Sequence, residues 1–84
     1  MEYNISYKKS VAKDLKRIDK VEVVKILDSL EDKLKQDPQT AGKALIGEFK
    51  GLFRLRIGNY RVIYSIMDGE VLILRIAHRK DSYR

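Results

Sequence analysis

Three apolar runs separated by two short polar turns fill the second half of the chain. The runs span residues 52–57, 60–66 and 71–77 and are rich in the β-branched, aliphatic and aromatic side chains that favour strands. Gly58-Asn59 separates the first two runs and Asp68-Gly69 the last two, and Asp-Gly between apolar runs is a strong hairpin signal. The sequence therefore predicts an antiparallel meander of three strands.

The first half of the chain has a helical period instead. Residues 3–7 alternate large and small side chains and predict a short strand. A helix is then expected from Ser10 or the lysines before it, because apolar residues fall at i, i+4 and i+7 on one face. Asp19 followed by Glu22 resembles a capping pair for a second helix, and Asp37-Pro38 is expected to stop it. Residues 39–51 are expected to form a loop.

Together these patterns predict one α+β domain over residues 1–84. An N-terminal helical hairpin packs on one face of a small antiparallel β-sheet, in the order β-α-α-β-β-β, with the first strand at one edge. The chain has no cysteine and one histidine, so we expect no metal site and no cofactor. No apolar run approaches the roughly 20 residues that cross a bilayer, and no signal peptide opens the chain, so we expect a cytoplasmic protein.

The positive charge of the chain is unevenly distributed. The net charge is +6, and six of the seven arginines lie after residue 50, whereas most lysines lie before residue 44. Arginine presents a planar fork that matches phosphate oxygens, while lysine is a flexible, hydrated point charge. The arginine-rich second half therefore indicates a surface that binds phosphate groups.

Alternation along the strands predicts where these arginines meet. Arg54 and Arg56 share one face, and a turn over residues 57–60 sets Arg56 opposite Arg61. A tight turn at Asp68-Gly69 then sets Arg61 opposite Ile76, with His78 one step further along the same face. Like charges side by side are destabilising unless an anion lies between them. The alternative is a solvated strand face on which the arginine stems cover apolar neighbours.

Two further groups of polar side chains belong to this hypothesis. The segment His78-Arg79-Lys80-Asp81-Ser82-Tyr83-Arg84 follows the last strand and adds an imidazole, cations and a phenol beside the arginines. Lys9, Lys13 and Arg17 on the first helix either contact nucleic acid or only solvate their helix. Both interpretations of the helix stay open.

At these residues the chain resembles the RelE/ParE toxin superfamily. The resemblance covers nearly the whole chain, and its most specific part is the Gly-x-Tyr-Arg-x-x-Tyr strand at residues 58–64, preceded by Arg54-x-Arg56. An ending of His-Arg-x-x-x-Tyr, residues 78–83 here, is similar to RelE-type mRNA interferases. ParE-type gyrase poisons generally lack that tyrosine.

The resemblance implies roles for individual residues. Arg61 would hold the scissile phosphate, Arg79 would stabilise charge or protonate the leaving oxygen, and Tyr83 would help activate the ribose 2′-hydroxyl. Arg54 and Arg56 match positions where RelE-type enzymes often carry lysine, and because arginine keeps its proton, both should act electrostatically.

The implied activity is metal-free cleavage of mRNA by attack of the 2′-oxygen on the adjacent phosphate. His78 is an additional candidate acid or base, since its reference pKa lies near neutrality. The ribosome is expected to orient the substrate, and the cations Lys9, Lys13, Arg17 and Lys80 are expected to contact RNA.

The resemblance also implies an antitoxin partner. The apolar side chains expected on the arginine face have no third helix to cover them, and an exposed apolar patch indicates a partner; these are Ile63, Leu72, Leu74 and Ile76. The expected partner is a RelB-like antitoxin whose acidic amphipathic segment wraps this face in a hetero-oligomer.

Three classes of function remain open on the sequence. They are a ribosome-dependent endoribonuclease toxin, a ParE-type toxin that inhibits DNA gyrase without nuclease activity, and a non-catalytic RNA-binding module. The first two share a fold, so the residues at the end of the last strand must separate them.

Overall fold

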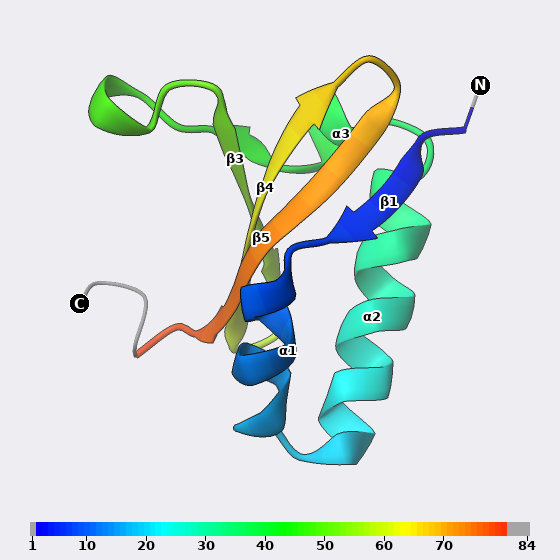
Figure 1. The fold of residues 1–84 in the computed structure, drawn as a ribbon, viewed down its shortest axis with the longest axis vertical. Coiled ribbons are helices and arrows are strands. Elements are labelled where there is room, and N and C mark those ends of the chain that lie inside the picture. The colour runs from blue at the N-terminus through cyan, green and yellow to red at the C-terminus, as the bar shows by residue number, and fades with distance from the viewer. Residues whose placement is uncertain (1, 81–84) are drawn as a thin grey trace.

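In the computed structural model, which describes residues 2–80, five strands form one sheet, which is twisted (Figure 1). The strand order is β1-β5-β4-β3-β2. The strands are β1 (Asn4–Tyr7), β2 (Lys43–Ala44), β3 (Leu52–Ile57), β4 (Tyr60–Met67) and β5 (Glu70–His78). β1 pairs with β5 in parallel, whereas the remaining neighbours are antiparallel. The expected edge position of the first strand is confirmed, but the sheet is mixed rather than antiparallel, because the helices between β1 and the meander bring the chain back in the same direction.

The predicted helical hairpin is present as α1 (Lys9–Lys16) and α2 (Lys20–Leu34). Asp19 takes the N-cap position of α2 as expected, but its side chain makes no capping hydrogen bond, so the capping interpretation was wrong in that respect. α2 ends at Leu34, before Asp37-Pro38. Among the described residues, no helix has both the length and the apolarity to cross a membrane.

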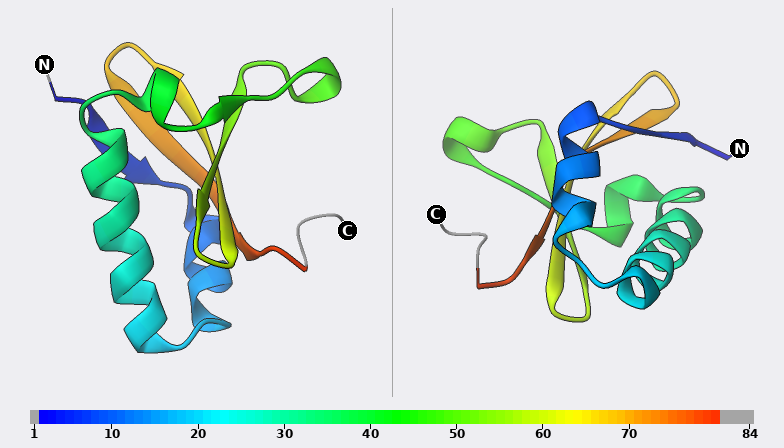
Figure 2. Two further views of the ribbon diagram at one scale, coloured as in Figure 1. Left: turned by 180° about the vertical axis from the view of Figure 1, so that it is seen from behind. Right: turned by 60° about the horizontal axis from the view of Figure 1, so that its bottom comes forward.

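Residues 39–51 are more ordered than the loop that the sequence predicted. Pro38 opens a short helix, α3 (Pro38–Ala41), because its fixed φ suits the first turn of a helix. The edge strand β2 follows, and a 3-10 turn, η1 (Gly47–Phe49), lies in the segment that projects from the body (Figures 1 and 2).

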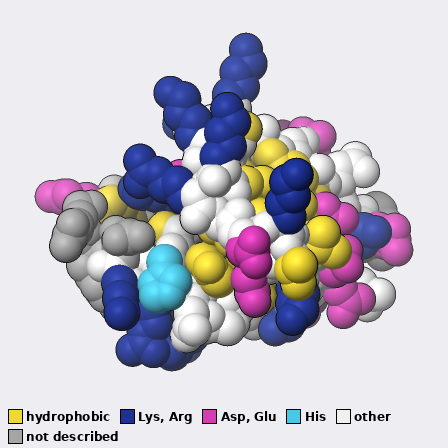
Figure 3. Space-filling model, turned by 90° about the horizontal axis from the view of Figure 1, so that it is seen from below, with side chains coloured by type: hydrophobic (Ala, Val, Ile, Leu, Met, Phe, Trp, Pro, Cys, Tyr) yellow, Lys and Arg dark blue, Asp and Glu magenta, His cyan; other side chains and the backbone are white. Residues whose placement is uncertain are grey.

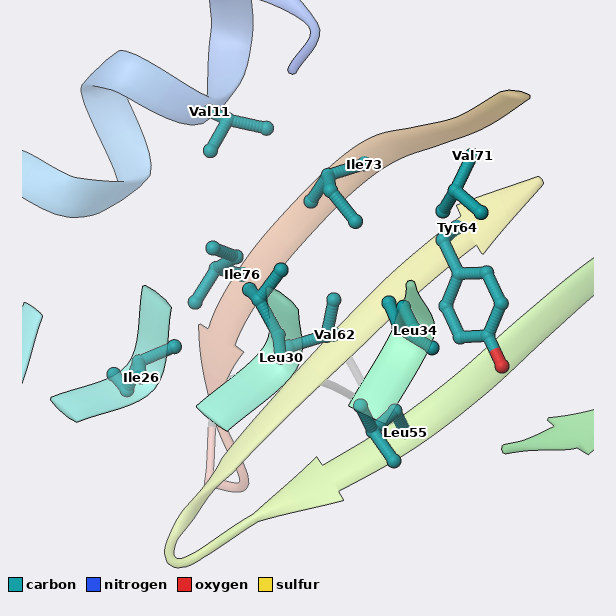
Figure 4. Packing of buried hydrophobic residues seen from close by; sticks show 10 residues of the cluster. All are labelled: Val11, Ile26, Leu30, Leu34, Leu55, Val62, Tyr64, Val71, Ile73 and Ile76. Atoms are coloured by element: carbon teal, nitrogen blue, oxygen red, sulfur yellow. The ribbon is translucent and has the colours of Figure 1, made fainter. Parts of the chain in front are cut away.

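The hydrophobic core lies between the two main helices and one face of the sheet (Figure 4). The buried side chains come from α1, α2 and the three long strands, and they are Val11, Ile26, Leu30, Leu34, Leu55, Val62, Tyr64, Val71, Ile73 and Ile76. The helices lie on this side of the sheet, and among the described residues no helix covers the other face (Figure 2). That uncovered face is called the open face below.

Both predicted turns are confirmed, but the pairing of β4 with β5 contains one irregularity that the sequence did not predict. Gly58, Asp68 and Gly69 have positive φ, the backbone geometry that a two-residue hairpin turn needs. Between β4 and β5, Ile63 pairs with Arg75 but Tyr64 pairs with Ile73, so Leu74 is an extra residue in β5. This β-bulge shifts the register of every pair between it and the end of β5.

Candidate functional site

Arginines from two adjacent strands share the open face. Arg56 lies directly opposite Arg61, as predicted, and Arg54 lies opposite Ile63. Lys43 of β2 lies opposite Arg54 on its other side. Residues directly opposite each other in an antiparallel pair point to the same face, so the four cations lie together.

These cations line a cleft of about 330 Å³ at the β2–β3 side of the sheet. Its lining residues are Lys33, Ala41, Gly42, Lys43, Arg54, Leu55, Arg56 and Arg61. Five of the eight are basic, and within residues 2–80 no aspartate or glutamate lines it. Like charges repel at this spacing, so the cleft is suited to an anion. It is called the first basic cleft below.

The far wall of this cleft depends on a close contact between Gly42 and its neighbours. The Tyr64 hydroxyl donates a hydrogen bond of 2.7 Å to the Pro38 carbonyl oxygen, and the Tyr64 ring stacks on Phe53 with centroids 5.4 Å apart. Burial raises the pKa of Tyr64, and a backbone hydrogen bond from Gly42 partly offsets this. A Cβ at residue 42 would lie 2.6 Å from the Arg54 carbonyl oxygen, so only glycine fits.

Lys33 and Lys43 belong to the cleft although sequence reasoning missed both. Lys33 comes from the last turn of α2 and Lys43 from a two-residue strand inside a predicted loop. The sequence carried no local signal for either position, because only tertiary packing brings them next to β3.

The bulge changes the predicted position of His78. Arg61 pairs with Ala77 rather than Ile76, and His78 pairs with Tyr60, so the histidine points away from the face of Arg61. The expected convergence of His78 with the arginines is therefore wrong. The rings of Tyr60 and His78 meet edge to face with centroids 5.3 Å apart. In the view from below, the histidine lies beside Lys and Arg side chains (Figure 3).

The backbone just after β5 continues alongside the β3–β4 turn. The Arg79 amide donates to the Asn59 carbonyl oxygen at 2.8 Å, and the Lys80 amide donates to His78 Nδ1 at 3.2 Å. These contacts hold the start of the tail at the end of the sheet that carries Arg61. Tyr83 lies outside the described residues.

The basic residues of α1 do not all lie together. Lys9 and Lys13 are exposed on the helix, and Arg17 follows its last residue as the C-cap. Arg17 lines a second cleft beside β5, together with His78. Lys80 is exposed just beyond the last strand.

The apolar patch expected on the arginine face is smaller than predicted. Ile63 lies opposite Arg54 and Arg75 on the open face, and Leu72, which is 38% exposed, lies opposite Ser65. Ile76 is only 1% exposed and belongs to the core, so its assignment to this patch was wrong. Leu74 is the bulge residue and is half-buried.

Comparison with known proteins gives consistent matches over the chain. The model of a family described as the ParE toxin of the parDE type II toxin–antitoxin system matches residues 5–83. Toxin RelE of Mycobacterium tuberculosis is 34% identical over 84 residues, covering 98% of this chain and 87% of the relative. Toxin RelG of the same organism is 33% identical over 86 residues, covering 100% and 99%.

Solved structures show the same architecture. A chain of the M. tuberculosis toxin–antitoxin complex RelBE2 superimposes with a TM-score of 0.88 at 30% identity, covering 96% of this chain and 95% of that one. A mutant of Escherichia coli toxin RelE in the free state gives a TM-score of 0.76 at 15% identity, covering 99% and 90%, which shows the fold alone.

Proposed function

Because this chain belongs to the family of ParE toxins of type II toxin–antitoxin systems, within the RelE/ParE superfamily, we propose that it is a toxin that cleaves ribosome-bound mRNA. The observation that carries the proposal is the Arg56–Arg61 pair in the first basic cleft. The names of the relatives, RelE and RelG, also favour the RelE type of activity over the gyrase-directed type.

The cleft has the charge that RNA cleavage requires. As the 2′-oxygen attacks the adjacent phosphorus, negative charge grows on the phosphate oxygens, and fixed cations stabilise that charge more than they stabilise the ground state. Arg61 would hold the scissile phosphate, and Arg54 and Arg56 would act electrostatically, since a guanidinium keeps its proton. The crowding of these side chains would be relieved when the phosphate binds.

The proton transfers are assigned to the tail. Tyr83 would help remove the 2′-hydroxyl proton, which passes to solvent. Arg79 would stabilise the negative charge on the leaving 5′-oxygen, which takes its proton from water because a guanidinium keeps its own. The bond from phosphorus to the 5′-oxygen breaks as the bond to the 2′-oxygen forms, which leaves a 2′,3′-cyclic phosphate and a 5′-hydroxyl. Only RNA supplies this nucleophile. His78, which points away from Arg61, has no role in this scheme.

The partners follow from the same surface. The ribosome would present mRNA to the cleft in the cytoplasm, and Lys9, Lys13 and Lys80, all exposed, would contact RNA. An acidic amphipathic antitoxin segment would cover Ile63 and Leu72 and neutralise the neighbouring arginines. A structure of the related RelBE2 toxin in its antitoxin complex supports this.

Gyrase inhibition is the second candidate, and the observation that favours it is the matching family model, which describes a ParE toxin. The two candidates predict different effects of a Tyr83 substitution on activity. Gyrase inhibition does not depend on a 2′-hydroxyl or on a phenol that activates it, so Tyr83→Phe would leave it intact.

The test combines purified protein with translating ribosomes and maps the 5′ ends that appear on the mRNA, with a DNA supercoiling assay in parallel. Cuts within ribosome-bound codons that disappear with Arg61→Ala and persist with Lys35→Ala are expected. Lys35 is a suitable control because it is an exposed cation just beyond α2, away from the cleft. Inhibition of DNA supercoiling by gyrase, without any mRNA cleavage, would overturn the proposal in favour of the gyrase candidate.

A further inference from the structure

A second basic cleft lies between α1 and the adjacent edge of β5. Its volume is about 270 Å³, and its lining residues are Asp14, Arg17, Ile18, Tyr60, Arg75, Ile76, Ala77 and His78. Arg17 and Arg75 bring two permanent positive charges from different elements, and both side chains belong to exposed residues. Within residues 2–80 the two basic clefts have no lining residue in common.

The β-bulge and Asp14 build this cleft. The extra residue in β5 carries Arg75 to the position opposite Ile63, whereas strict alternation would have turned it toward the core. The Asp14 carboxylate then accepts a hydrogen bond of 3.0 Å from the Ile76 amide, which fixes α1 against the strand edge. The one acidic group among the described lining residues is thereby hydrogen-bonded to the backbone, and the two guanidinium charges of Arg17 and Arg75 outnumber its single negative charge.

The aromatic wall of the cleft suits a nucleotide. Tyr60 and His78 meet edge to face there, and Nδ1 of His78 accepts the Lys80 amide. Rings beside arginines are the usual combination in proteins that bind single-stranded nucleic acid.

The two clefts are adjacent across one strand pair. Arg61 lines the first cleft and Ala77 lines the second, and these two residues are direct partners in the β4–β5 register. Neighbouring strands lie about 4.8 Å apart, and Ala77 places only a methyl group on the open face between the clefts. A bound strand can therefore pass from Arg61 over Ala77 to the edge of β5, where the second cleft lies.

We propose that Arg17 and Arg75 bind a second phosphate of the same RNA strand whose scissile phosphate lies at Arg56 and Arg61. The inference rests on the proposed function and adds a subsite to it. Cleavage chemistry occurs in the first cleft, and the second cleft fixes the direction in which the RNA strand leaves the open face over the edge of β5 toward α1.

The salt dependence of RNA binding tests this subsite. The probe is a short single-stranded RNA that is 2′-O-methylated throughout, so that it lacks the nucleophile and the unmodified protein can be used. For single strands the slope of log K against log salt concentration is about −0.7 per phosphate contact. The double variant Arg17→Ala/Arg75→Ala should therefore bind more weakly and with a slope shallower by about 0.7.

The matched control removes two charges elsewhere. Lys25→Ala/Lys35→Ala lies on and just after α2, outside both clefts, and should leave the slope unchanged. Thermal denaturation by circular dichroism should show that both double variants fold, since all four residues are exposed.

Each outcome separates the subsite from the proposed function. A slope that is unchanged in Arg17→Ala/Arg75→Ala, or equally reduced in the lysine control, would overturn the subsite even if ribosomal cleavage persists. A slope that falls in the arginine variant alone supports the subsite, and absence of Arg61-dependent cleavage would then count against the proposed function only. Failure of the unmodified protein to bind the probe would overturn the subsite.

Discussion

Replacement of Gly42 by alanine should destabilise the wall of the first basic cleft. A Cβ at this position would lie 2.6 Å from the Arg54 carbonyl oxygen, whereas ordinary contact begins at 3.4 Å. The same Cβ would overlap the Tyr64 hydroxyl. The backbone of β3 and residue 42 must therefore separate by about 0.8 Å, since the carbonyl oxygen cannot rotate away as a side chain can.

The expected loss of stability in Gly42→Ala follows from the contacts of the added Cβ with Arg54 and Tyr64. Overpacking of a well-packed site costs typically about 1–3 kcal/mol, and displacing Tyr64 from its 2.7 Å hydrogen bond to Pro38 costs about 1 kcal/mol more. We expect a total near 2 kcal/mol when part of the strain relaxes, and for a domain of this size that corresponds to a fall in Tm of roughly 8–16 °C.

A double-mutant cycle with Tyr64→Phe checks the assignment. Because phenylalanine lacks the hydroxyl, Gly42→Ala should cost at least about 0.5 kcal/mol less in that background than in the unmodified protein. Urea denaturation followed by circular dichroism measures both differences. Lys43→Ala is the control, because this exposed neighbour should change stability by no more than about 0.5 kcal/mol. A Gly42→Ala protein as stable as the unmodified one, or strictly additive losses, would refute the close-contact argument.

Three further predictions concern the strand register and pH. Arg56→Gln should abolish mRNA cleavage yet leave Tm unchanged or raise it at low salt, because it relieves a cross-strand repulsion of about 0.2–1 kcal/mol; a clear drop in Tm would contradict this. Asp14→Ala should lose about 1 kcal/mol through the missing acceptor for the Ile76 amide, and Asp14→Asn, whose oxygen still accepts, should lose less; equal losses in thermal denaturation would count against that role. Burial and the hydrogen bond to Glu31 raise the pKa of Tyr7 above its ordinary 10.0, so the folded protein holds this proton more tightly than the unfolded chain and stability should fall as pH rises above about 10. Urea denaturation should show a shallower fall for Tyr7→Phe, and identical pH profiles would disprove the assignment.

The turns of the meander were predictable because each has a local cause. Gly58, Asp68 and Gly69 all adopt positive φ, which glycine tolerates freely and aspartate more readily than most residues. The Arg56–Arg61 pairing followed from the first of these turns alone. Such features need no knowledge of the rest of the fold.

The register beyond Leu74 was mispredicted because alternation was assumed to continue through β5. The buried positions are Val71, Ile73 and Ile76, so their spacing changes from two residues to three. Strict alternation would have put the Arg75 guanidinium in the core opposite Val62, where an unpaired charge is very costly. That cost was visible in the sequence and would have indicated the bulge.

Residues 38–44 were mispredicted for a different reason. α3 and β2 are too short to form by local preference, since an isolated helical turn is unfavourable. They depend on long-range contacts of the Tyr64 hydroxyl with Pro38 and of Gly42 with β3. The lysine side of the first basic cleft could not be found from the sequence for the same reason.

The Arg56–Arg61 pair can persist because side chains on the opposite face of the same strands are buried in the core and stabilise the strand register. Leu55 and Val62 form the neighbouring cross-strand pair on the core side and are almost completely buried. Full burial of such a side chain contributes about 1.5–3 kcal/mol, whereas the repulsion between Arg56 and Arg61 costs about 0.2–1 kcal/mol. A slip of one residue would separate the arginines but turn the core side chains to solvent. The core therefore fixes the register, and the register keeps two guanidinium groups side by side on the open face, ready for a phosphate.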